Sequence, residues 1–352
     1  MIRDSGVAFG SLHFYADGKT SGLTAHRFGL VLEFHNSPEK LSTVIRYRVG
    51  KLDAISRNIS WSSIRFSDII GCNPAVAISN DGYVIVVYAN QAYELGSHLY
   101  YRIGKIDPAG GRDQTIVWLT NAIYLGAGVH ASIAMNSNNF IVMAHESATG
   151  DKRIYYEVGR LITVASSGNY HIRFDKWASD HDIGINPAIA MNDRNEVVAV
   201  RQLTNEPVVE YRRGIIVGST IQLGQSRRYD DYAEYPAVAL LNSGLVLEVN
   251  GTGQGVISRI GELSKVNAEE IEWSTPVKEF EMDFHAPALA ISGDIPILSF
   301  DDGNSFVPKI YFTVGVAISK EGYVLVVGSN NSIKNGCGRR PSGSWGKPSP
   351  LD

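Results

Sequence analysis

A segment of roughly 50 residues recurs along nearly the whole of this 352-residue chain, and this repeat restricts the fold more than any other feature. Its clearest marker is an aromatic-rich strand that ends in glycine, such as Tyr47-Arg48-Val49-Gly50. By subtraction of residue numbers, the equivalent glycines are 54, 55, 55, 47 and 54 residues apart: Gly50, Gly104, Gly159, Gly214, Gly261 and Gly315. The repeat therefore predicts six copies of one structural unit.

Each unit also contains two short apolar runs and a later strand that carries a tryptophan. The first run follows a proline, as in Asn73-Pro74-Ala75-Val76-Ala77-Ile78, and a turn of Asn, Asp and Gly residues leads into the second. Two such runs predict a β-hairpin. The later strand is seen at Ile116-Val117-Trp118. Each unit is therefore expected to contain four strands, which we name A to D. The hydrophobic residues show no 3.6-residue helical periodicity, so we predict an all-β chain. Four antiparallel strands per unit predict that each unit is one blade of a β-propeller.

Two segments bear on the number of blades. The stretch from Val7 to Gly10 is typical of a strand D, and the stretch from Val316 to Val327 is typical of a further A–B hairpin. We expect six blades, with seven as the alternative, because seven would leave two blades incomplete. Residues 1–330 are then one propeller domain, and residues 331–352, rich in Gly, Pro, Ser and Arg, are a disordered or adventitious tail.

Composition excludes several classes of partner. The formal net charge of −4 argues against non-specific binding of nucleic acid or anionic membranes. No apolar run reaches the roughly 18 residues of a membrane-spanning helix.

Two distant cysteines form no disulfide framework, and we expect Cys72 to be buried and Cys337 exposed. The first residues lack a secretory signal, so the protein is either intracellular or, as we favour, secreted with its signal absent from this sequence. The oligomeric state stays open.

Polar residues gather where the innermost strands of the predicted blades begin and end. In a propeller the start of strand A and the end of strand B emerge on the same face, near the axis. The candidate residues at these positions are Asn73, His130, Asn186 and Tyr235 on strand A, and His35, Tyr88, His145, Glu146, Arg201 and Asn250 on strand B. Because the interiors of both strands are apolar, this polar set predicts a functional ring. Ordinary solvated strand ends are the alternative.

The candidate catalytic residues are His130, His145, Arg201 and Tyr88. His130 and His145 are expected to face each other, with Glu146 beside them. Imidazole and phenol groups can transfer protons, and a guanidinium can neutralise a carboxylate. The cluster suits β-elimination of a uronate, and it suits hydrogen bonding to a sugar equally well. We predict no cofactor, although two histidines and a carboxylate leave a divalent cation open.

The proline-led runs, the glycine-ended strands and the tryptophan strands resemble those of lectin-like propellers, from about Val7 to Val327. A looser similarity is to ulvan-lyase-type polysaccharide lyases, whose site uses His, Tyr and Arg at strand ends on adjacent blades. That resemblance implies a carbohydrate ligand, with His130, His145 and Arg201 at matching positions.

Three functions therefore compete. The first is a carbohydrate-binding, lectin-like propeller. The second is a polysaccharide-degrading enzyme, either a lyase or a glycoside hydrolase, with a single site at the axis. The third is a protein-interaction scaffold. The divergence of equivalent residues among the blades argues against many identical sites, and the sequence leaves open whether the protein is an enzyme.

Overall fold

A computed structural model describes residues 8–316 of the chain, and all of its regular secondary structure is β. The residues that it leaves undescribed within this span are 10–12, 18, 27, 38–43, 91–95, 108–113, 165–167, 176–180, 229–232, 253–254, 281–284 and 302–308. Nowhere in the described part of the chain is there a helix long and apolar enough to cross a membrane.

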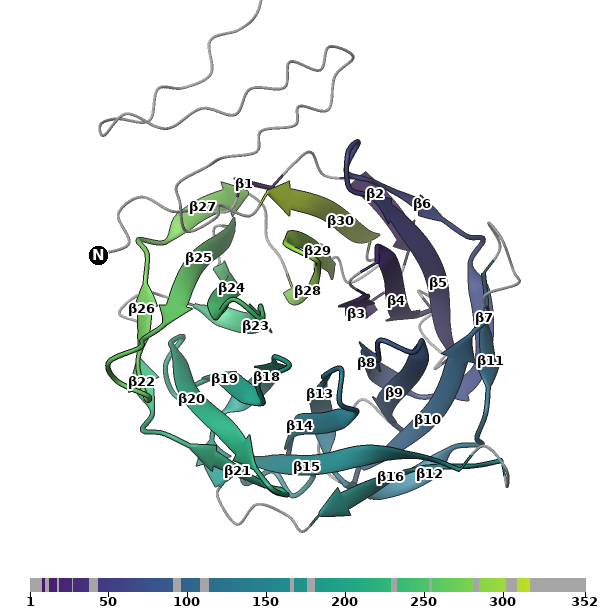
Figure 1. The fold of residues 1–352 in the computed structure, drawn as a ribbon, viewed down its shortest axis with the longest axis horizontal. Helices are drawn as coiled ribbons and strands as arrows, with labels where there is room; N and C mark the ends of the chain where they lie inside the picture. Colours follow the sequence, from purple (N-terminus) through teal and green to yellow (C-terminus); the bar gives the residue numbers. More distant parts are fainter. Residues whose placement is uncertain are drawn as a thin grey trace, which may run out of the picture.

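The strands form six antiparallel sheets arranged around a central axis, so the chain is a six-bladed β-propeller (Figure 1). Blade 1 contains β3 (Lys19–Ala25), β4 (Leu30–Asn36), β5 (Val44–Asp53), β6 (Asn58–Trp61) and β7 (Arg65–Ile70). Blade 2 contains β8 (Cys72–Ile78), β9 (Tyr83–Ala89), β10 (His98–Ile106), β11 (Ile116–Trp118) and β12 (Ile123–Ala127). Blade 3 contains β13 (Val129–Met135), β14 (Phe140–Glu146), β15 (Arg153–Val164), β16 (Asn169–Asp175) and β17 (His181–Ile183).

The remaining blades repeat this order. Blade 4 contains β18 (Ile185–Met191), β19 (Glu196–Gln202), β20 (Val209–Val217), β21 (Thr220–Leu223) and β22 (Arg227–Arg228). Blade 5 contains β23 (Glu234–Leu240), β24 (Leu245–Thr252), β25 (Gly255–Leu263), β26 (Ile271–Trp273) and β27 (Val277–Phe280). Blade 6 contains β28 (His285–Ser292), β29 (Ile295–Asp301) and β30 (Lys309–Val316), together with β1 (Ala8–Phe9) and β2 (His13–Asp17).

The prediction of six blades with four antiparallel strands each is confirmed, with strand D interrupted. In blade 1, β6 pairs with the last residues of β5, whereas β7 pairs with its first residues. Together the two short strands cover the edge of strand C. The same division recurs in every blade, which is why each sheet has five strands rather than four.

The N-terminal segment closes the ring. β1 and β2 both pair antiparallel with β30, with Ala8 opposite Val316 and His13 opposite Phe312. The innermost strand β28 packs against β3, so the last blade meets the first. Beyond Val316, the expected extra hairpin and the expected tail at 331–352 lie outside the described residues.

The repeated glycine and tryptophan have one structural cause. A Cβ atom on Gly50 would lie 2.6 Å from the Trp61 ring, and one on Gly261 would lie 2.8 Å from the Trp273 ring. Only glycine lets the tryptophan of strand D lie flat against strand C. Between the blades, alternate side chains of strand B face opposite neighbours, and these apolar layers form the core.

Candidate functional site at the mouth of the channel

Strand A of most blades begins with a β-bulge. In blade 2, residues 73–74 oppose the single residue Tyr88, between the pairs Cys72–Ala89 and Ala75–Val87. The first bulge residue has a positive φ in four blades: 50° at Asn73, 45° at His130, 50° at Asn186 and 48° at Tyr235. A non-glycine residue costs roughly 1–2 kcal/mol in this region, and such strain is concentrated at functional sites. The structure thus gives four of the predicted residues one unusual conformation.

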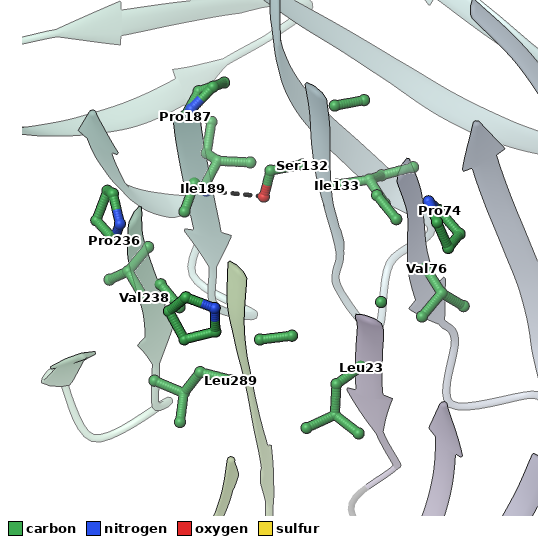
Figure 2. A pocket seen from close by; sticks show the side chains of 17 residues that line it. Leu23, Pro74, Val76, Ser132, Ile133, Pro187, Ile189, Pro236, Val238 and Leu289 are labelled. Carbon is green, nitrogen blue, oxygen red and sulfur yellow. Dashed lines mark hydrogen bonds between the residues drawn. The ribbon is translucent and has the colours of Figure 1, made fainter. Parts of the chain in front are cut away.

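Inside the ring of bulges lies a channel lined mainly by apolar side chains (Figure 2). Its cavity has a volume of about 160 Å³, and Pro74, Pro187 and Pro236 contribute to its wall. The hydroxyl of Ser132 also lines it, but this oxygen accepts a hydrogen bond from the backbone N–H of Ile189 at 3.1 Å. Polar chemistry is therefore expected at the mouth of the channel, where strand A begins, rather than along its wall.

At the mouth, His130 is held by a buried carboxylate. Its Nδ1 lies 2.9 Å from Oε1 of Glu146, at the end of β14 in the same blade. The same oxygen accepts the backbone N–H of Asn186, in blade 4, at 2.7 Å. The Glu146 side chain is almost fully buried, whereas that of His130 is 34% exposed. A buried anion therefore orients a solvent-accessible imidazole.

Gln202 repeats this arrangement one blade further on. Its Oε1 accepts a hydrogen bond from Nδ2 of Asn186 at 3.0 Å and one from the backbone N–H of Tyr235 at 3.3 Å. The contacts form one continuous series, which we call the mouth belt: His130, Glu146, Asn186, Gln202 and Tyr235. Blades 1 and 2 are joined in a similar way, because Oδ1 of Asn36 accepts the N–H of Asn73 at 3.2 Å. The strand ends thus connect neighbouring blades as well as presenting polar groups.

His145 does not join His130, contrary to the expected arrangement. Its Nδ1 lies 3.1 Å from the backbone oxygen of Glu146, and its Nε2 lies 3.1 Å from Oε1 of Glu157. The ring is buried and stacks on Tyr155. The cause is strand geometry: successive side chains point to opposite faces, so His145 faces blade 2 while Glu146 faces blade 4.

Arg201 is buried in a network of acids between blades 3 and 4. Its guanidinium donates to Asp182 at 2.9 Å and to Glu210 at 2.6 Å. Arg212 donates to the other Asp182 oxygen at 3.1 Å, and Tyr156 donates to Asp182 at 2.8 Å. Burial, with the nearby Asp182 charge, raises the pKa of Tyr156. The guanidinium that was expected to neutralise a substrate carboxylate is already paired with two carboxylates of the protein.

Three further candidates also lie beneath the surface. His35 is buried, with its Nδ1 2.9 Å from Oε2 of Glu33. Asn250 is buried, and its Nδ2 donates to Glu248 at 3.0 Å. Tyr88 is also buried, which raises the pKa of its phenol. Of the ten predicted residues, the half-buried ones are Asn73, His130, Asn186 and Tyr235.

Two partners in the site lie outside the set of candidate residues. The candidate set did not include Gln202, although it holds in blade 4 the position of Glu146 in blade 3, so the repeat register could have identified it. Glu157, the partner of His145, lies on strand C and had no sequence signal. Among the described residues, no group of three or more His, Cys, Asp or Glu side chains is placed to hold a metal ion.

The fold is shared with sialidases of known structure. No known sequence family and no curated protein matches the chain. A Hadza microbial sialidase superposes with a TM-score of 0.56 at 11% identity, over 84% of this chain and 65% of that one. The Trypanosoma rangeli sialidase in complex with the inhibitor DANA gives 0.55 at 10% identity, over 89% and 55%. A protein of unknown function from Dyadobacter fermentans gives 0.57 at 10% identity, over 89% and 97%.

These comparisons establish the fold alone, because the identities are so low. The chain spans less than two thirds of the length of either sialidase. The sequence resemblance to propellers is confirmed at the level of architecture; two of these three solved neighbours are sialidases and the third has no known function. What the comparisons support is a six-bladed, sialidase-like propeller fold.

Proposed function

We propose that this protein is a glycan-processing enzyme whose active site is the mouth of the channel, with His130 as the proton-transferring group. One observation carries the proposal: a buried carboxylate, Glu146, orients a half-exposed imidazole beside an apolar cavity. Placement of a histidine by a carboxylate is a recurring device of acid–base catalysis, because it fixes the ring and its tautomer.

The geometry assigns a role to each ring nitrogen. In the tautomer whose Nδ1–H donates to Glu146, Nε2 is the basic nitrogen of His130. Such a nitrogen can remove a proton from a water molecule in hydrolysis or from carbon in β-elimination, and it can return that proton to the leaving oxygen. Asn186 and Tyr235 lie further along the mouth belt, and we place their half-buried side chains among the groups that contact the sugar.

A sugar substrate is supported by the fold and by the polar character of the mouth. The solved neighbours include sialidases, one of them determined in complex with sialic acid. We place neutral glycans ahead of uronates as substrates, because Arg201 is committed to Asp182 and Glu210. A uronate would need a cation to neutralise its carboxylate.

A lectin is the second candidate, favoured by one specific feature. Asn73, His130, Asn186 and Tyr235 occupy equivalent bulge positions with the same backbone conformation in four blades. A ring of polar groups around an axis can bind a glycan without transforming it. The two candidates differ in whether a product forms.

The test is a search for products from soluble polysaccharides. Hydrolysis creates new reducing ends, and elimination creates an unsaturated product that absorbs in the ultraviolet. We expect His130→Asn to lower turnover at least about 100-fold, while His171→Asn, on the outer strand of the same blade, leaves it unchanged. Undiminished turnover in His130→Asn would overturn the assignment, and binding without product would favour the lectin.

A further inference from the structure

A three-residue ladder crosses every blade at the same register. A residue one or two positions before the end of strand B pairs with a residue of strand C, which pairs with a residue of the outer strand. In blade 2 the ladder is Tyr88, Tyr100 and Tyr124, directly opposite one another on β9, β10 and β12. Residues directly opposite on neighbouring strands share one face of the sheet. Three tyrosines therefore stand in a row on one face of blade 2.

The row leads from the mouth to the outer edge of the disc, in the order β9, β10 and β12 (Figure 1). Tyr88 lies opposite the bulge at the mouth and is buried, whereas Tyr124 is 56% exposed. The ring centroids of Tyr88 and Tyr100 are 6.1 Å apart, and those of Tyr100 and Tyr124 are 5.7 Å apart. The imidazole of His98 packs against Tyr124 at 5.6 Å. We call the three contacting rings the tyrosine row. Tyr88 packs in the core between blades 1 and 2, Tyr100 is partly buried against that core, and Tyr124 faces solvent.

The fold itself does not require aromatic residues at these positions. The same ladder in blade 4 is Arg201, Glu210 and Arg228, joined by ion pairs of 2.6 and 3.0 Å. In blade 5 it is Asn250, Ile257 and Lys278. One backbone position thus accepts charged, polar and apolar residues. Aromatic residues also occupy the ladder of blade 6, as Phe300, Tyr311 and Phe14, so aromatic character alone does not set blade 2 apart. The feature of blade 2 that bears on binding is the solvent-facing ring of Tyr124.

A charged pair lies beside the row. Asp68, on β7 of blade 1, forms an ion pair with Arg102 on β10, and the Asp68 side chain is 73% exposed. The Arg102 guanidinium lies 4.7 Å from the centroid of the Trp118 ring and donates to the backbone oxygen of Thr120 at 2.9 Å. The carboxylate is therefore held in place while it remains open to solvent.

We infer that the exposed end of the tyrosine row, Tyr124, with Asp68 nearby, binds a sugar residue of a chain at the outer edge of the disc. Pyranose rings have apolar faces of C–H groups that pack on aromatic rings, and their hydroxyls form hydrogen bonds with carboxylates and phenols. An exposed ring with an adjacent acceptor, separate from the mouth, suits a substrate long enough to contact both places. This inference rests on the proposed action on glycans and adds that the substrate is a polysaccharide rather than a single sugar.

Affinity electrophoresis tests the row directly. The probes are native gels that contain xylan, galactomannan, hydroxyethyl cellulose or hyaluronan. We expect at least one polysaccharide to retard the wild-type protein, and Tyr124→Ala to weaken that binding about tenfold. The matched control is Phe28→Ala, which removes an aromatic side chain that is 70% exposed in the turn between β3 and β4, away from the mouth, and should bind normally.

Kinetics separate this inference from the proposed function. Tyr124→Ala should raise KM for the polysaccharide with little change in kcat, and it should leave turnover of a disaccharide unchanged. His130→Asn should lose turnover and keep retardation. Retardation that needs Tyr124 in a protein without turnover would overturn the enzyme and retain the row. Equal retardation of Tyr124→Ala and wild type would overturn the row. So would retardation by none of the four probes, a result that favours a protein partner.

Discussion

Oε1 of Glu146 lies 2.7 Å from the backbone nitrogen of Asn186, so a side chain of blade 3 holds the second residue of blade 4. The same oxygen holds His130, which makes one carboxylate responsible for an interblade contact and for the orientation of the candidate catalytic group. Substitutions at Glu146 should therefore affect both catalysis and stability, and the two effects can be measured separately.

Glu146→Gln should lower kcat about 10- to 100-fold, because the neutral amide does not stabilise the positive charge that His130 gains when it takes up a proton. Asn186 can still donate to the amide oxygen, so the variant should fold. The measurement is the dependence of kcat/KM on pH, which reports the ionisation of the free enzyme. A merely structural role for Glu146 would leave the shape of that profile unchanged.

The matched control is the second carboxylate–histidine pair of blade 3. Glu157→Gln alters the contact of 3.1 Å with His145, which is buried away from the mouth. It should destabilise the fold by about 1–3 kcal/mol and leave the pH profile of the folded protein as in wild type. Equal kinetic effects of the two variants would contradict the special role of Glu146.

Arg201→Met should destabilise the protein by about 3 kcal/mol, since it leaves the buried carboxylates of Asp182 and Glu210 without their shared cation. Arg228→Met removes a second partner of Glu210, but that arginine is largely exposed and its loss should cost less than about 1 kcal/mol. Urea unfolding measures both. An Arg201→Met protein of normal stability without turnover would instead support the catalytic role predicted from the sequence.

The repeat made the fold predictable because its signals are local. The proline of strand A, the glycine of strand C and the tryptophan of strand D each reflect packing within one blade, as the close approach of Gly50 to Trp61 illustrates. The stretch from Val7 to Gly10 could also be assigned as a strand D from the sequence, and there β1 pairs with β30 in the last blade.

The site was less predictable because it depends on the direction in which each side chain points and on the register in which the strands pair. His145 and Glu146 are adjacent in sequence, yet the alternation of a strand sends them to different blades. The bulge that turns His130 toward Glu146 has no marker of its own in blade 3, where Ala131 replaces the proline. The row of Tyr88, Tyr100 and Tyr124 needs exact pairing across two loops, which residue spacing does not reveal.

Deletion of residues 1–17 should lower the thermal midpoint by about 10 °C or more and promote association. The deletion removes β1 and β2, which leaves the backbone groups of β30 unpaired at an exposed edge. Differential scanning calorimetry and light scattering measure the two effects. Deletion of residues 331–352, the predicted tail, should change neither. An unaltered midpoint without β1 and β2 would contradict closure of the ring by the N-terminal segment.

Glu248 should make the stability depend on pH. Burial raises its pKa from 4.5 to about 7, although Arg259 and Asn250 oppose the shift. Between these two values the folded protein holds a proton that the unfolded chain has lost, so the free energy of unfolding should fall as pH rises from about 4.5 to about 7. The decrease amounts to about 3 kcal/mol and should level off above the folded-state pKa.

Glu248→Gln should abolish this part of the pH dependence, because the amide does not ionise and can still accept from Nδ2 of Asn250, which lies 3.0 Å from the carboxylate. Urea unfolding at pH 5, 6, 7 and 8 gives the free energies for wild type and variant, and their difference isolates the contribution of Glu248. Glu272→Gln, an exposed change on β26 of the same blade, is the control and should follow wild type throughout. If the difference between Glu248→Gln and wild type stayed constant from pH 5 to pH 8, Glu248 would have to be ionised throughout that range, held so by Arg259.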